Sequence, residues 1–306
     1  MIRPTRADPA GRVYLDLQNQ ARRQRRGTQE LLTLYVLERF LARLSASDHA
    51  DRFVLKGGML LAALSARRPT ADLDLMATHL ANDERTVLNR IVEIAAIAPA
   101  QDDGVTYRTE TGRARTIRES DLYTGVRISM EARVSSASVK LALDINFGDP
   151  ITPAPELIEY PALLDGMTPV RILGYPVHTV LAEKITTAVN LGAASTRVRD
   201  YLDIWTLTGI HDLDAAQTRA ALEATATHRQ ITLRPLSQAV ADLATARAQT
   251  YTAFLRRLGP DAAPCPRDFR LVVDEVVAFA DPLLAADRPQ DSRWSAARRR
   301  WTTGQP

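Results

Sequence analysis

The spacing of apolar residues changes about halfway along this chain, and no other feature of the sequence constrains the fold as much. Segments 105–115, 122–133 and 137–147 alternate apolar and polar residues, as strands with one buried face do. From about residue 177 onward, apolar residues return at intervals of three and four, which is typical of amphipathic helices. The sequence therefore predicts an α+β protein whose mixed or antiparallel sheet precedes a helical part.

The expected domains follow this change. We expect an N-terminal domain at 1–165, a helical domain at 166–287 that completes the active site, and a loosely held basic tail at 288–306. Proline and glycine residues punctuate the join between the domains. Helices are expected at 11–26, 28–45, 59–64, 83–97, 178–190, 197–208, 214–226, 236–257 and 267–284, and further strands at 53–55 and 72–75.

Composition favours a globular enzyme. Of 306 residues, 45% are hydrophobic, and no stretch reaches the roughly 18 apolar residues that a membrane helix needs. The segment Met1–Arg26 is too polar and basic for a secretory signal. The single Cys265 fits a reducing compartment, so we expect a cytoplasmic protein. The five histidines show no zinc-ligand spacing, which argues against a zinc site.

The cations are unevenly divided between their two types. Of 39 Lys and Arg residues, only Lys56, Lys140 and Lys184 are lysines, which leaves 36 arginines. A lysine that persists against such a bias marks a place where a compact ammonium suits the task better than a planar guanidinium. Chance is the alternative reading.

Two aspartates share one face of a short predicted strand. In Asp72-Leu73-Asp74-Leu75 both carboxylates leave one face and both leucines the other. The two like charges repel, and a bridging divalent cation would remove that repulsion. The alternative is that these acids simply cover the solvent face of a sheet.

A third aspartate lies on a later strand. In 139–146 the apolar residues share one face, and Asp144 points to the other, together with Lys140 and Asn146. If this strand neighbours the first, Asp144 joins Asp72 and Asp74 at one metal cluster. Two Mg²⁺ ions at such a cluster stabilise the attacking and leaving oxygens of a phosphoryl transfer. Carboxylate oxygens are ligands that Mg²⁺ prefers.

Two glycines follow the predicted strand at 53–55. Lys56-Gly57-Gly58 opens a helix, so its backbone N–H groups can point at an anion, and the missing Cβ atoms allow a phosphate to approach. A simple tight turn explains the glycines equally well.

In combination, these segments resemble the AbiEii-type nucleotidyltransferase toxins, which include the mycobacterial MenT toxins and lie within the DNA polymerase β-like superfamily. The resemblance spans about residues 53–209. It rests on Leu55–Leu61, Arg68–Asp74, Leu143–Ile145, Leu181–Lys184 and Arg197–Trp205. Where the superfamily often has Gly-Ser, this chain has Gly57-Gly58, so a hydroxyl contact to phosphate would come from Thr70, or a backbone group would replace it.

Lys184 lies at the edge of the apolar stripe of its helix. A partly buried ammonium needs an anion in reach, and the resemblance also implies a contact with the triphosphate. The alternative is that its aliphatic stem merely covers apolar surface.

On the next helix Asp200 and Asp203 lie away from the core stripe. An Arg199–Asp203 pair on a wet face is one reading. The resemblance favours Asp200 or Asp203 as a site residue that holds Lys184 or a metal-bound water.

The resemblance further implies the substrate and the partner. Such toxins add nucleotides from an NTP to the 3′ end of tRNA and block translation, and an antitoxin accompanies them. Arg22-Arg23, Arg25-Arg26, Arg67-Arg68 and Arg298–Arg300 are candidates for contacts with an RNA backbone, although charge runs are usually solvated surface. No motif with interleaved aromatic residues indicates base recognition.

Two alternatives stay open. One is a nucleotidyltransferase that modifies a protein or a small molecule. The other is a non-catalytic regulator that binds nucleotide or RNA, although such a protein would be expected to lose one of the acids. The predicted catalytic residues are Asp72, Asp74, Asp144, Lys184 and Asp200, with the first three as ligands of two Mg²⁺ ions. The predicted nucleotide-binding residues are Lys56, Gly57, Gly58, Thr70, Lys184 and Asp203.

Overall fold

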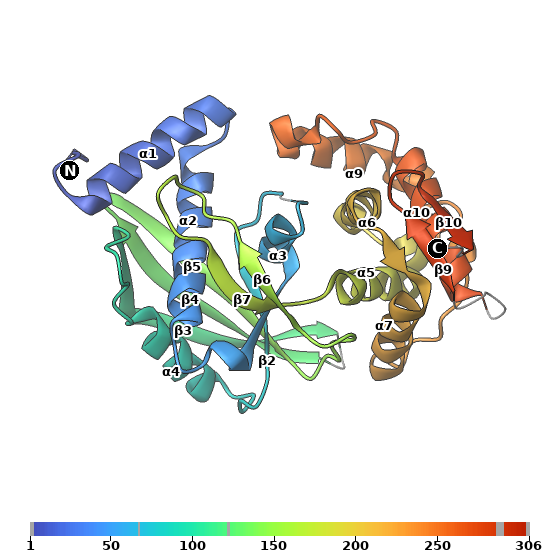
Figure 1. Ribbon diagram of the computed structural model, residues 1–306, viewed down its shortest axis with the longest axis horizontal. Helices are drawn as coiled ribbons and strands as arrows, with labels where there is room; N and C mark the ends of the chain where they lie inside the picture. The colour runs from blue at the N-terminus through green and yellow to red at the C-terminus, as the bar shows by residue number, and fades with distance from the viewer. Residues whose placement is uncertain (1–2, 67, 121–122, 286–290, 304–306) are drawn as a thin grey trace. The chain divides into compact units, whose positions relative to one another are not determined.

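The computed structural model describes residues 3–66, 68–120, 123–285 and 291–303 and divides into two compact units. The sheet unit comprises Met1–Ala63, Arg67–Gly148 and Glu156–Gly174. The helical unit comprises Leu64–Ala66, Asp149–Pro155 and Tyr175–Pro306. Figure 1 shows the elements of both.

The sheet unit is built on a mixed sheet in the order β3-β4-β5-β2-β1-β7-β6. The parallel pairs are β2 with β5 and β1 with β7, and the other neighbours are antiparallel. The mixed sheet predicted from the alternation is confirmed. The strands are β1 (Phe53–Lys56), β2 (Leu73–Ala77), β3 (Val105–Ser120), β4 (Tyr123–Val134), β5 (Ala137–Phe147), β6 (Glu156–Tyr160) and β7 (Val170–Gly174).

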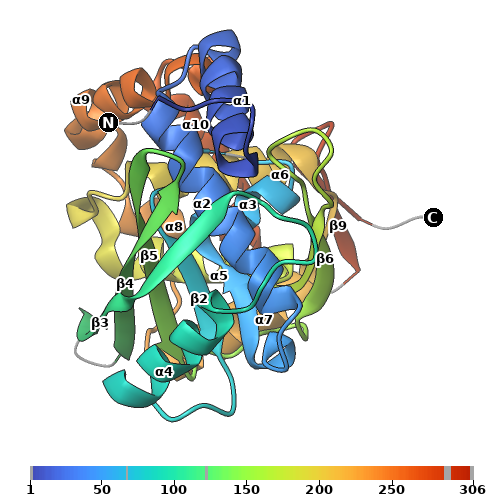
Figure 2. The same ribbon diagram turned by 90° about the vertical axis from the view of Figure 1, so that its left-hand side faces the viewer.

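Helices cover the apolar side of the sheet. Alternate residues of β4 and β5, such as Ile128 and Leu143, are fully buried. Helix α2 packs on β5 and β7, while α4 packs on β3 and β4 (Figures 1 and 2). The carboxylate of Asp83 caps α4 by accepting from the Thr86 N–H at 2.8 Å. The helices are α1 (Pro9–Gln24), α2 (Thr28–Ser45), α3 (Gly57–Ala63) and α4 (Glu84–Ala95).

Strands β6 and β7 were not expected from the sequence. β7 pairs with β1 at Leu55 and Gly174, and its other edge pairs with β6. Residues 166–174 therefore belong to the sheet unit, whereas the sequence places the domain boundary after residue 165. These strands are only five residues long, so their alternation is a weak signal.

The helical unit follows as predicted in type. Its helices are α5 (Val177–Leu191), α6 (Val198–Ile210), α7 (Ala215–His228), α8 (Leu236–Ala239), α9 (Leu243–Leu258) and α10 (Phe269–Leu284). The single helix expected at 236–257 is wrong. A turn, in which the Leu243 N–H donates to the Val240 carbonyl at 3.0 Å, separates α8 from α9.

The expectation of a loose tail from residue 288 is also wrong for residues 292–303. They form a hairpin of β9 (Ser292–Ser295) and β10 (Arg300–Thr303), and β9 pairs with β8 (Leu213–Asp214). Trp294 is 2% exposed, contacts the rings of Phe279 and Trp301, and donates its indole N–H to the Thr208 carbonyl at 2.7 Å. Burial of these aromatic rings holds the polar segment in place.

Among the described residues, none of the helices has the length and apolar character required to cross a bilayer.

Candidate functional site

A row of charged residues crosses the polar side of the sheet. In the register of the strands Lys56 lies opposite Asp74, Asp74 opposite Asp144, and Asp144 opposite Arg127. Residues paired in this way point to the same side of a sheet. Asp72 directly precedes β2, and its charge acts on the carboxyl of Asp74. From the sequence, Asp144 joins the other two aspartates only if its strand lies beside theirs. The structure shows that it does, because β5 pairs with β2.

The carboxyl of Asp74 lies in an unfavourable electrostatic setting. Burial raises its pKa to about 6, and the charges of Asp72 and Asp144 act in the same direction. The ammonium of Lys56 and a hydrogen bond from the backbone N–H of Gly58 oppose the rise in this pKa without cancelling it. Asp74 is thus a carboxyl that gains from an added positive charge.

The glycine turn is shaped by Asp74. Gly57 has φ +64°, and a Cβ on it would lie 1.9 Å from Asp74 Oδ2, so only glycine fits there. A Cβ on Gly58 would lie 2.6 Å from Thr70 Oγ1. The Thr70 hydroxyl is 3.1 Å from Asp72 Oδ1 and donates a hydrogen bond to it. In this structure the carboxylate of Asp74 lies against the glycine turn, and the carboxylate of Asp72 accepts the hydrogen bond from Thr70.

Arg127 is a site residue that the sequence analysis missed. Its Nε donates to Asp144 Oδ1 at 2.5 Å, and a terminal nitrogen donates to Asp144 Oδ2. The hydrogen bond to Asp144, together with the charges of Asp144, Asp72 and Asp74, raises the pKa of this guanidinium. The only signal in the sequence is that this arginine lies on the polar face of a predicted strand. That pattern does not indicate which strand is its neighbour.

The acids have the donor chemistry of a magnesium site, but they do not form a ready-made cluster. Within residues 3–66, 68–120, 123–285 and 291–303, no group of three or more His, Cys, Asp or Glu side chains is placed to hold a metal ion. Both oxygens of Asp144 bind Arg127 instead. Burial raises the pKa of Asp74, and the negative charges of Asp72 and Asp144 raise it further. The residues therefore fit a hard cation, provided that Arg127 releases Asp144.

A second charged cluster is built within the helical unit, from α5 and α6. Lys184 Nζ donates to Asp200 Oδ1 at 2.9 Å and to Asp203 Oδ2 at 2.7 Å. Arg197 Nε donates to the other oxygen of Asp200 at 2.5 Å. Both predicted acids thus hold the predicted lysine, whereas the sequence left open which one would do so.

The placement of these acids on a wet face is wrong. Asp200 is 4% exposed and Asp203 is 5% exposed. Burial alone would raise the pKa of Asp200, but the charges and hydrogen bonds of Lys184 and Arg197 outweigh it and hold that pKa far below its usual range. Two cations offset two buried carboxylates, which is the condition under which such charges are tolerated.

Two of the predicted arginine runs each contain an arginine that forms an ion pair within the protein. Arg26 forms an ion pair with Glu30 at 3.0 Å. Arg299 forms an ion pair with Glu275 at 2.8 Å, and its guanidinium lies 4.2 Å from the centre of the Trp205 ring. Arg299 therefore fastens the C-terminal hairpin to its own unit.

The other predicted cations are placed as follows. Lys140 is exposed and lies on the same side of the sheet as Asp144, opposite Glu131 in the register. Arg67, half of the predicted Arg67-Arg68 pair, lies outside the described residues. Arg22, Arg23 and Arg25 are exposed at the end of α1.

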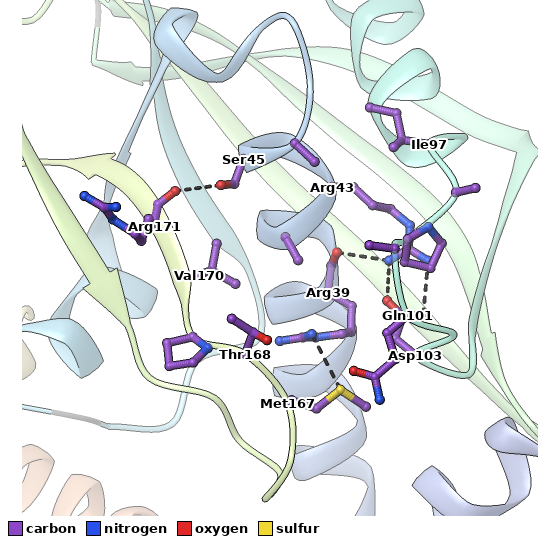
Figure 3. Close-up of a pocket in the computed structure, with 16 residues that line it drawn as sticks. Arg39, Arg43, Ser45, Ile97, Gln101, Asp103, Met167, Thr168, Val170 and Arg171 are labelled. Atoms are coloured by element: carbon purple, nitrogen blue, oxygen red, sulfur yellow. Dashed lines mark hydrogen bonds and ion pairs between the residues drawn. The ribbon is translucent and has the colours of Figure 1, made fainter.

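The sheet unit also contains a cavity of about 380 Å³ between α2, residues 97–103 and residues 167–171 (Figure 3). Its two buried arginines bind the protein itself. Arg43 donates to Asp103 Oδ2 at 2.7 Å, and Arg39 forms an ion pair with Glu38. None of the predicted site residues lines this cavity.

A family model matches most of this chain. It is described as "Nucleotidyl transferase AbiEii toxin, Type IV TA system" and matches residues 39–275. A curated protein from Dichelobacter nodosus, named an extracellular basic protease, is 31% identical over 118 residues, which is 36% of this chain and 19% of that protein. The chain thus spans about a fifth of that relative's length, and the match does not establish a family.

Two solved structures from Helicobacter pylori are similar at low identity. The crystal structure of JHP933 has a TM-score of 0.46 and 14% identity, and the comparison covers 83% of this chain and 92% of that one. A structure described as a putative nucleotidyltransferase has a TM-score of 0.38 and 15% identity, with the same coverage. At these TM-scores neither likeness establishes a shared fold.

Proposed function

Because this chain belongs to the AbiEii nucleotidyl transferase toxin family, we propose that it transfers nucleotides from an NTP to the 3′ end of tRNA and thereby blocks translation. Membership of a toxin–antitoxin family brings with it an NTP substrate and an antitoxin partner. The tRNA acceptor and the dependence on two Mg²⁺ ions are the proposed parts.

One observation supports the proposed chemistry most directly. Asp74 and Asp144 lie opposite each other on the neighbouring parallel strands β2 and β5, and the charge of Asp72, directly before β2, acts on Asp74. At the glycine turn that opens α3, the backbone N–H of Gly58 donates a hydrogen bond to the carboxylate of Asp74. Three acids beside an N–H-bearing turn form a suitable arrangement for binding a metal–triphosphate complex.

We assign the acids to metal binding. Asp72, Asp74 and Asp144 would hold the Mg²⁺ ions, with Asp144 released from Arg127. The ions, when bound, stabilise negative charge on the attacking and leaving oxygens. The acceptor 3′-oxygen forms a bond to the α-phosphorus, the bond from that phosphorus to pyrophosphate breaks, and the hydroxyl proton passes to a carboxylate. The positive charge of Lys56 lies beside Asp74, where it can also attract the triphosphate.

Lys184 is assigned to the triphosphate. Asp200 and Asp203 fix the position of its ammonium through hydrogen bonds of 2.9 Å and 2.7 Å, which lowers the entropy lost when the ammonium binds a phosphate. Asp203 then acts through Lys184 rather than on the nucleotide directly.

The experiment that tests this function supplies labelled NTPs, one at a time, with Mg²⁺ and three acceptors: total tRNA, total protein and a pool of small molecules. We expect label on the 3′ end of tRNA. Asp72→Asn and Asp74→Asn should each lower transfer by roughly 100-fold or more, because each removes a charged ligand but keeps the shape of the side chain.

The matched control is Asp51→Asn, which changes an exposed aspartate of the same unit and should leave transfer unchanged. Label on protein or on a small molecule, with none on tRNA, would replace the proposed acceptor. Full transfer by a folded Asp74→Asn variant would refute the assignment of the acids.

A further inference from the structure

The charged row on the sheet does not end at Arg127. Arg115 on β3 lies opposite Arg127 on β4, which in turn lies opposite Asp144. Residues paired across strands share one side of the sheet, so Arg115 points to the same side as the acids. Figure 2 shows β3 and β4 side by side as one long hairpin.

A second exposed arginine accompanies Arg115. Arg113 lies two positions earlier on β3 and therefore on the same side, opposite Ser129. Both Arg113 and Arg115 are exposed. Within the part of the chain that the structure describes, neither guanidinium takes part in an ion pair, and Arg113 donates only to the Gly112 carbonyl, at 2.8 Å. We call Arg113, Arg115 and Arg127 the arginine row.

The far end of the same hairpin is different. Arg133, on the same side of β4, donates to Glu131 at 3.1 Å, and Arg108 donates to Glu131 at 2.9 Å and to Glu110 at 2.8 Å. Acidic residues thus balance the arginines there. At the other end, beside the aspartates, Asp144 balances Arg127, whereas Arg113 and Arg115 have no acidic partner among the described residues.

Asp144 binds Arg127 within the fold, but among the described residues no acidic partner accounts for Arg113 and Arg115. Like charges directly opposite each other on a sheet, such as Arg115 and Arg127, are destabilising. The opposite side of the same strands packs against the rest of the unit. Val126 is 1% exposed there, and the Thr116 hydroxyl donates a hydrogen bond to Glu84 of α4 at 2.7 Å. Two exposed arginines that lack an acidic partner and lie beside a third arginine are better explained by an anionic ligand.

The order of charges across the sheet provides two separate places where an anion can bind. Lys56 lies on one side of the aspartates, next to the glycine turn, and the arginine row lies on the other side. A triphosphate beside the turn and an acceptor beside the arginines would therefore meet at the acids. Strands lie about 4.8 Å apart, so the backbone of Arg115 is about 10 Å from that of Asp144, within reach of the nucleotides next to a reacting 3′ end.

We propose that the arginine row binds the phosphodiester backbone of a single-stranded polynucleotide whose 3′ end is the acceptor. Arg113 and Arg115 contact phosphates of the acceptor strand, and Arg127 turns from Asp144 towards it when the site is loaded. Arginine contacts of this kind position a strand without reading its bases. The inference rests on the proposed function and identifies where its acceptor binds.

The test measures binding without catalysis. Arg113→Gln/Arg115→Gln is compared with wild type and with Arg133→Gln, which removes an arginine already balanced by Glu131. A short, fluorescently labelled single-stranded RNA and a DNA of the same sequence are titrated in EDTA, without NTP, at several salt concentrations. Circular dichroism checks that each variant is folded.

The double variant should bind the RNA about tenfold or more weakly at low salt. Each lost phosphate contact lowers the slope of log Kobs against log salt by about 0.7 on a single strand, so the slope should fall by about 1.4. Arg133→Gln should match wild type, and so should the affinity of the double variant for a non-hydrolysable NTP. The DNA titration shows whether the row requires a 2′-hydroxyl nearby.

Three outcomes would overturn the proposal: wild type that binds neither polynucleotide, a double variant with unchanged affinity and salt slope, or a double variant that loses NTP affinity alone. The last result would assign the row to the triphosphate. Weakened RNA binding in the double variant, combined with no nucleotide transfer to RNA by wild type, would support the surface while refuting the proposed function.

Discussion

Asp74 illustrates, at the scale of single residues, how a proposed metal ligand can oppose folding. Its carboxyl is crowded by Asp72 and Asp144 and partly buried, and its pKa rises to about 6. In the unfolded chain the same carboxyl ionises near its ordinary value of about 3.9. The folded state therefore pays a free-energy cost whenever Asp74 is ionised without a cation beside it.

This cost predicts the pH dependence of stability in EDTA. Between about pH 4 and pH 6 the folded state keeps a proton on Asp74 that the unfolded state has lost, so stability contributed by this group falls as pH rises. Above pH 6 the loss is complete, at about 2–3 kcal/mol. Asp74→Asn lacks this loss and should unfold at higher urea than wild type at pH 7.5, but not at pH 4. Equal urea midpoints at pH 7.5 would contradict the raised pKa.

Lys184 needs a test that separates its structural contacts from binding. Removing it alone takes away the ammonium that the buried carboxylates of Asp200 and Asp203 share, which is destabilising. Lys184→Ala combined with Asp203→Asn removes one charge of each sign. This double variant should keep most of its stability, yet show a KM for every NTP about tenfold higher or more, because the triphosphate loses its ammonium contact.

Asp203→Asn alone is the control for the Lys184 prediction, since it keeps the ammonium. Steady-state kinetics with each NTP, beside urea unfolding, separates the two effects. NTP kinetics equal to wild type in the double variant would assign the cluster of Lys184 to the fold alone.

At the scale of elements, the connection from β1 to α3 is decided by one glycine. Gly57 combines a left-handed backbone with a position where a Cβ would overlap Asp74 Oδ2. A side chain at residue 57 would strain this turn and overlap Asp74, which lies opposite Lys56 of β1.

Gly57→Ala should therefore lower both stability and transfer. Backbone strain alone costs about 1–2 kcal/mol, and the overlap also displaces Asp74. The matched control is Gly166→Ala, because Gly166 has φ +82° but nothing lies within 4 Å of its added Cβ. Only strain applies there, so transfer should persist. Urea unfolding and the transfer assay, run on both variants, separate strain from displacement; equal transfer by the two would contradict the role of the overlap.

At the scale of the whole molecule, the chain contributes to its two units in several pieces. Leu64–Ala66 and Asp149–Pro155 belong to the helical unit although sheet-unit segments flank them. The C-terminal hairpin likewise returns to β8 over many residues. Such long-range pairings make the last described residues part of the core of the helical unit rather than an appendage.

Trp294→Ala should accordingly cost about 3–5 kcal/mol of unfolding free energy, as expected for a buried aromatic residue. The indole contacts Phe279 and donates a hydrogen bond to Thr208, and both interactions are lost. Leu271→Ala on α10 is the control, because that leucine is 54% exposed and its loss should change little. If Trp294→Ala changed the free energy of unfolding as little as the control does, the prediction of a loosely held tail would be correct after all.

The parts that were predictable share a physical origin. The alternation in 122–133 and 137–147 correctly placed apolar residues on one side and Asp144 on the other, because side-chain direction in a strand is set locally. The place of Lys184 at the edge of an apolar stripe predicts an anion in reach, and the family resemblance points to Asp200 or Asp203. By contrast, β6, β7 and the hairpin at 292–303 are short and depend on distant partners, so local spacing did not reveal them.

The sequence by itself determined which residue types face the polar side of each strand and which glycines permit a tight turn, since these depend on backbone geometry and near neighbours. Only the tertiary structure decided that β2 lies beside β5 and β4, and with it that Asp74 meets Asp144 and that Arg127 and Arg115 extend the row. Strand order is fixed by the packing of the whole sheet against its helices, and no local pattern in the chain encodes it.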